Sequence, residues 1–178
     1  MVKIYTKSSY GSIIIKGMCF ILIATLFITL SGFSPVAAQQ VREIDSYISE
    51  IGNVNPQKAA RLSNLVYDVQ PTVYINDGAF SPIGTGTMLV AQIDTGDFNR
   101  LLEGHVSLET VSLLMIHIKD RTELQALRLP TSLLQVMPNL EFVFFSLGFD
   151  AVQGENFSGL QGFDAPQIVL LYESARPF

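Results

Sequence analysis

The chain has 178 residues, sixteen of them acidic and eleven basic, with one cysteine and no tryptophan. An acidic balance without a basic cluster argues against nucleic acid and against anionic membrane surfaces as partners. A single cysteine excludes an internal disulfide and a thiolate metal cluster.

The N-terminus is typical of a secretory signal peptide. Three lysines precede an uncharged apolar run over residues 18–30, and Val36-Ala37-Ala38 offers the small residues that a signal peptidase needs. We therefore expect residues 1–38 to be removed. The apolar run is shorter than the roughly 20 residues that span a bilayer comfortably.

The remaining chain, residues 39–178, is expected to be one exported α/β domain in the periplasm, outside the cell or on its surface. The alternative is an uncleaved anchor over residues 13–33, which would then be the chain's link to a membrane. Cleavage would also remove Cys19, all acidic residues would stay, and the formal charge would become −8.

Residues 39–70 are predicted to form a helical hairpin. Apolar residues recur at helical spacing in both halves, and Gly52-Asn53 separates them. Asn55 is a candidate N-cap, and Pro56 suits the first turn of the second helix.

Residues 71–178 are predicted to contain the sheet. "TVYI" from Thr72 is a β-branched and aromatic run that the turn signal Asn76-Asp77-Gly78 closes, and "AFSPIGTG" has a loop composition. The Gly-rich residues 148–166 are predicted to be a long surface loop. The central strands are expected near Val90, Leu113, Leu127, Val143 and Leu170.

Similar blocks recur every sixteen residues from Ser107. The segments "SLETVSL", "ELQALRL" and "NLEFVFF" share a Leu-x-x-Leu-x-Leu type of pattern. Its last two apolar positions lie on the same side of an extended strand. If the pattern recurs, such strands can stack in parallel around one continuous core.

These three segments, with "LLQVMPNLEF" leading into the last, resemble leucine-rich repeats over residues 107–147. The resemblance implies short parallel strands that line a concave face, and a binding or scaffolding role. The sixteen-residue spacing is shorter than in that family, and the Asn that usually follows the strand is missing. An ordinary α/β domain with neighbouring strands stays open as the alternative.

The binding hypothesis places an unknown extracytoplasmic protein against this sheet. By alternation, its contact residues would be Ser112, Arg128, Glu141 and Phe144, together with Phe142. If the last strand is interior, Phe142 and Phe144 need a second cover. That cover is a helix if both sides of the sheet are packed, and a partner if they are not.

An enzymatic alternative rests on Asp94-Thr95-Gly96, which follows an apolar strand. It resembles the active-site motif of retropepsin-like aspartic proteases, in which two such carboxylates meet across a homodimer and share a proton. That resemblance would make Asp94 catalytic. The segment also suits a helix cap or turn.

Other chemistry has weaker support in the sequence. His105 and His117 lack a metal-ligand spacing, so we expect neither a metal site nor a cofactor. A Ser/His/Asp triad assembles only in space and leaves no linear signature, although the nucleophile-elbow motif of hydrolases is missing. Asn156 begins a glycosylation sequon by letter.

Overall fold

A computed structural model of the protein describes residues 40–101, 108–130, 132–151, 157–160, 163 and 165–174. Its elements are β1 (Arg42–Glu43), α2 (Ile44–Gly52), α3 (Pro56–Tyr67), β2 (Thr72–Asn76), β3 (Ala79–Ile83), β4 (Val90–Asp94), η1 (Thr95–Asp97), α4 (Phe98–Leu101), β5 (Leu113–Ile118), α5 (Arg121–Ala126), α6 (Leu133–Val136), β6 (Phe142–Leu147), η2 (Ser158–Leu160) and β7 (Val169–Ser174). The expected α/β class, with two N-terminal helices and a largely parallel sheet, is confirmed. The predicted leader, His105 and Asn156 lie outside the described residues. No helix within these ranges is long and apolar enough to cross a membrane.

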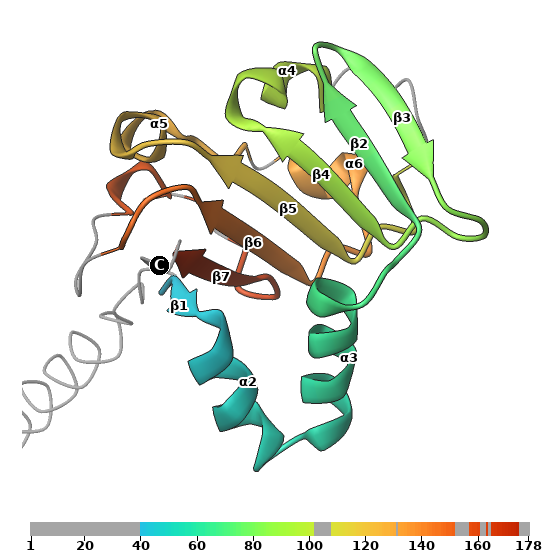
Figure 1. The fold of residues 1–178 in the computed structure, drawn as a ribbon, viewed down its shortest axis with the longest axis vertical. Helices are drawn as coiled ribbons and strands as arrows, with labels where there is room; N and C mark the ends of the chain where they lie inside the picture. Colours follow the sequence, from blue (N-terminus) through green and yellow to red (C-terminus); the bar gives the residue numbers. More distant parts are fainter. Residues whose placement is uncertain are drawn as a thin grey trace, which may run out of the picture. The chain divides into compact units, whose positions relative to one another are not determined.

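The described strands form one seven-stranded sheet in the order β1-β7-β6-β5-β4-β2-β3 (Figure 1). Every neighbouring pair is parallel except β2 and β3. The strands β4, β5, β6 and β7 follow one another across the sheet in chain order. Their carboxyl ends therefore share one edge of the sheet.

The β2–β3 hairpin occupies one end of the sheet. Its turn has Asp77 at φ 50° and Gly78 at φ 75°, so both central residues are left-handed, as in the tight turns that suit a hairpin. The predicted turn is thus confirmed. The expectation of a loop was wrong for Ala79–Ile83, which pairs with β2 along its whole length, whereas residues 84–86 lie outside any strand as predicted.

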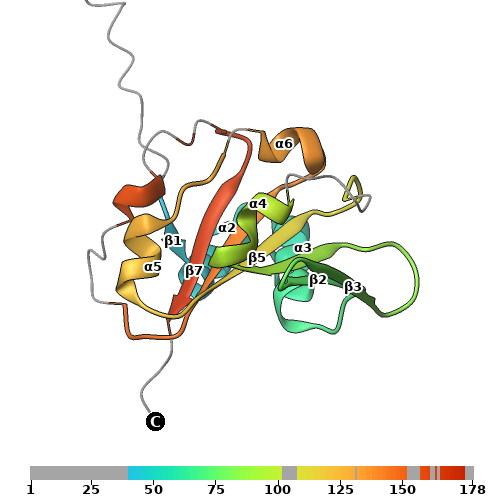
Figure 2. The ribbon, with the colours of Figure 1, turned by 90° about the horizontal axis from the view of Figure 1, so that it is seen from above.

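Both faces of the sheet are packed. Leu114, Ile116 and Phe145 belong to the larger core, which includes side chains from the segments that connect the parallel strands. Leu113, Phe142 and Phe144 lie on the opposite face, where the α2–α3 hairpin covers them. Figure 2 shows β2 and β3 reaching beyond α3, at the opposite end of the molecule from α5.

The strand expected near Leu127 was wrong. That segment is helix α5, which ends at Ala126, and Leu127 follows it outside any strand. Asp120 caps this helix by accepting the Thr122 and Glu123 amides, while a Glu123 carboxylate oxygen accepts the Lys119 amide. This reciprocal capping stabilises a helix where the sixteen-residue pattern predicted a strand.

The register between β5 and β6 also departs from a sixteen-residue spacing. Leu114 pairs with Val143, and Ile116 pairs with Phe145, which places equivalent positions 29 residues apart. Leu113 pairs with Phe142, so the expected alignment of Leu113 with Phe145 was wrong.

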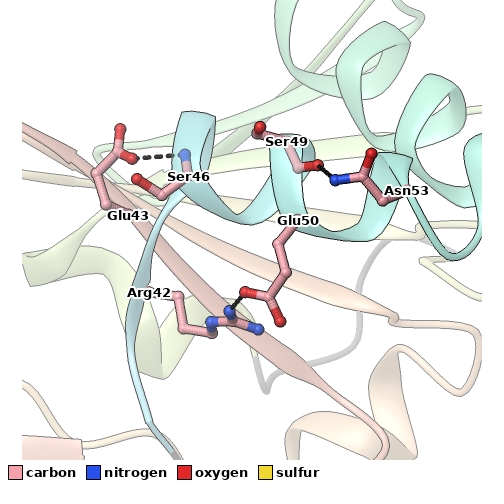
Figure 3. A network of polar contacts seen from close by, with 6 residues as sticks. All are labelled: Arg42, Glu43, Ser46, Ser49, Glu50 and Asn53. Carbon is pink, nitrogen blue, oxygen red and sulfur yellow. Dashed lines mark hydrogen bonds and ion pairs between the residues drawn. The ribbon is translucent and has the colours of Figure 1, made fainter.

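Polar contacts fix the start and end of α2 (Figure 3). The Glu43 carboxylate accepts hydrogen bonds from the Asp45 and Ser46 amides, and Asn53 Nδ2 donates to the Ser49 carbonyl. Arg42, which lies in β1 just before α2, forms an ion pair with Glu50 in that helix. In α3, Asn55 is the N-cap and accepts from the Lys58 amide, as predicted.

The segment 148–166, predicted to be a surface loop, contributes to the core. Leu160, Phe163 and Ala165 are each at most 6% exposed. These three residues belong to the larger core, so a purely surface placement of the segment was wrong.

Candidate functional site

Phe142 and Phe144 are enclosed by the protein itself. Their side chains are 0% and 3% exposed, and they pack with Ile44, Leu62 and Leu65 of the helical hairpin. The sequence left open whether a helix or a partner protein covers these rings, and in the structure helices cover them. The aromatic pair is therefore not a free contact surface.

Ser112 and Glu141 help to dock α3 on the sheet. Arg61 Nη2 donates to Ser112 Oγ at 3.1 Å and lies 2.7 Å from Glu141 Oε1. Ser112 is 4% exposed and Glu141 is half-buried. Both side chains thus bind the guanidinium group of an arginine of the same chain.

Arg128 lies apart from the other predicted contact residues. Its guanidinium donates to the carbonyls of Gln125 and Leu127 at the end of α5, and the residue is exposed. It borders an open depression of about 340 Å³ whose other lining residues include Thr95, Phe98 and Glu123. The structure therefore does not join Arg128 to Ser112 or Glu141.

Asp94 ends β4 inside the parallel part of the sheet. Its Oδ2 lies 3.2 Å from Lys119 Nζ, and it makes no side-chain capping bond to η1. The hydrogen bond and the charge of Asp94 raise the pKa of Lys119 above its ordinary value. An aspartic-protease dyad pairs one carboxylate with another across a homodimer, so the retropepsin-like role of Asp94 stays a prediction.

A groove of about 490 Å³ lies between α3 and the strand edge near Leu89. Its walls are mostly apolar and contain one charged side chain, Arg61. The lining residues are Gln57, Ala60, Arg61, Asn64, Leu65, Gln70 and Leu89. We call this space the α3 groove. A concave, mainly apolar space with a few polar groups is the usual form of a binding site.

Four further large apolar side chains outside the groove lining are exposed. Tyr67 is 49% exposed, Val69 is fully exposed, Tyr74 is 37% exposed and Ile83 is 59% exposed. Tyr74 and Ile83 share the sheet face of Val90, because Thr72 pairs with both Ile83 and Val90.

Tyr67 is held by a polar contact with α2. Its hydroxyl donates to Asp45 Oδ1 at 2.8 Å, which links the end of α3 to the start of α2. Partial burial, this hydrogen bond and the negative charges of Asp45, Glu173 and Glu43 raise the pKa of Tyr67 well above its usual range.

The sequence contained a signal for the exposure of Tyr74 and Ile83, but the prediction of a loop after Gly78 hid it. Tyr74 and Ile83 are apolar residues in short strands at the end of a sheet, where no helix of the described chain covers them. Recognition of β3 as a strand would have placed both on one face. Among the described residues, no group of three or more histidine, cysteine, aspartate or glutamate side chains could hold a metal ion.

Comparisons with known protein families, with curated proteins and with solved structures find no match to this chain.

Proposed function

We propose that this chain is a small exported binding domain that holds a protein partner in the α3 groove. The observation that carries the proposal is the mainly apolar lining of this open groove on a net acidic chain. Val69, Tyr74 and Ile83 add exposed apolar side chains elsewhere on the same domain.

The chemistry of the groove selects the kind of partner. Gln57, Asn64 and Gln70 carry neutral amides, which can both donate and accept hydrogen bonds. Leu65 and Leu89 supply apolar contacts. This combination suits a peptide segment that inserts one or two apolar side chains and offers its backbone to the amides.

The groove is not suited to nucleic acid, because Arg61 is the single charged residue of its lining and already pairs with Glu141. A phosphate backbone would need several unpaired cations. An extracytoplasmic protein remains the expected partner because of the predicted leader.

Photocrosslinking tests the proposal. A photoreactive amino acid at Gln57 should capture a partner from the exported fraction of the source cells, whereas the same group at exposed Gln135 on α6 should not. Ala60→Arg, an exposed helical substitution that fills the groove, should abolish the capture. Gln135→Arg serves as its matched control.

Thermal unfolding of both arginine variants shows whether each is folded. Equal capture from Gln57 and Gln135, or capture that survives Ala60→Arg in a folded protein, would refute binding in the α3 groove.

A further inference from the structure

A polar row crosses the carboxyl ends of four parallel strands, away from the α3 groove. Asp94 pairs in register with His117, His117 with Ser146, and Ser146 with Glu173. Residues paired in this way share one face of the sheet, and neighbouring strands are about 4.8 Å apart. The row thus places an imidazole between a carboxylate and a hydroxyl.

The row lies at the margin of the helical cover. His117 follows Leu113 and Met115 at alternate positions of β5, and both of those side chains contact the cluster under the α2–α3 hairpin. His117 and Ser146 themselves are half-buried. They are therefore partly shielded from water and still reachable from it.

The contacts of the row leave its reactive groups available. Lys119 Nζ lies 3.2 Å from Oδ2 of Asp94, and Oδ1 of Asp94 has no hydrogen-bond partner within the part of the chain that the structure describes. Within the described residues, neither the His117 ring nor the Ser146 hydroxyl makes a side-chain hydrogen bond. Catalytic hydrogen bonds are often long before substrate binds, and they tighten only in the complex.

We propose that Asp94, His117 and Ser146 form an acyl-transfer centre that hydrolyses small neutral carboxylic esters. Ser146 Oγ attacks the ester carbonyl carbon while His117 takes the hydroxyl proton, and His117 then gives that proton to the leaving alkoxide as the C–O bond breaks. Water next attacks the acyl-serine with His117 again as base. The acid is released and the Ser146 hydroxyl is restored.

The flanking charges define the roles and the substrate class. Asp94 orients the imidazole, and Lys119 is a positioning residue that fixes Asp94. Glu173 lies on the other side of Ser146. With Asp94, Glu173 and the ammonium group of Lys119 the row carries a net negative charge, so a neutral ester is favoured over a phosphate or carboxylate substrate.

Covalent labelling tests the assignment. A fluorophosphonate probe should modify Ser146, as located by peptide mass spectrometry, and the protein should hydrolyse p-nitrophenyl acetate. His117→Gln should slow labelling about a hundredfold, and Ser146→Ala should abolish both signals. Ser81→Ala, an exposed serine in β3, is the matched control.

Asp94→Asn provides a second variant, at a side chain that is 37% exposed, in case His117→Gln fails to fold, and thermal unfolding decides that point. It should also slow labelling of Ser146. An unlabelled Ser146 in the folded wild type, or equal labelling in folded His117→Gln or Asp94→Asn protein, would overturn the proposal. Neither outcome bears on binding in the α3 groove.

Discussion

Arg61 on α3 joins Glu141 at the start of β6, with Nη2 and Oε1 2.7 Å apart. The same nitrogen donates to the buried hydroxyl of Ser112, just before β5. One side chain thus ties the helical hairpin to two strands that follow it far along the chain.

Replacement of Arg61 by alanine should lower the free energy of unfolding by about 1 kcal/mol. The ion pair is half-exposed and contributes little, whereas the Ser112 hydroxyl loses its partner in a buried place. Urea unfolding of the single and double variants with Glu141→Ala should give a small coupling energy. A coupling well above 1 kcal/mol would mean that the pair is shielded more than its exposure indicates.

Phe142→Ala should destabilise the fold by about 3–5 kcal/mol, because it removes a fully buried ring between the sheet and the hairpin. Tyr74→Ala, on the same face but 37% exposed, should cost much less. Chemical unfolding of the two variants makes the comparison. Similar losses for both would contradict the unequal cover of the two ends of the sheet.

The sequence predicted those parts of the fold that rest on local signals. The Asn55 cap and the Asn76-Asp77-Gly78 turn depend on neighbouring residues and were correctly placed. The cover of Phe142 depends on α2 and α3, which lie far away in the sequence, and no local pattern specifies that contact. The polar row likewise exists only through the register of β4, β5 and β6.

The error at Leu127 has a different cause. Apolar spacing alone cannot separate a strand from a short helix, because a run such as "ELQALRL" satisfies both periods. The deciding signal was the Asp120-x-x-Glu123 pair, which caps α5.

Asp120→Ala should therefore destabilise the protein by about 0.5–2 kcal/mol, since two amides of the first turn of α5 lose their acceptor. Gln125→Ala, exposed in the same helix, should be nearly neutral. Thermal unfolding compares the two variants. An equal effect would show that the cap contributes nothing beyond helix propensity.

The raised pKa of Tyr67 predicts a stability loss in alkali. The folded state favours the neutral phenol, so this contribution is complete below the unfolded pKa of about 10 and is lost as pH rises through the higher folded value. Ultraviolet titration should show one tyrosine that ionises later than the others, and Tyr67→Phe should remove that step. Asp45→Asn should shift the step towards lower pH.

If the late step persists in Tyr67→Phe, another tyrosine carries it and the Tyr67–Asp45 hydrogen bond is not its origin. The size of the alkaline stability change should be modest, because Tyr67 is about half exposed.

The pairing of β1 with β7 has a consequence for the order of synthesis. Arg42 and Glu43, among the first residues of the domain to be made, find their sheet partners in Leu171 and Tyr172, among the last. The apolar face of α2 and α3 likewise waits for β6 and β7. A growing chain therefore carries the apolar face of these helices uncovered until β6 and β7 have been made, and this part of the sheet forms after them.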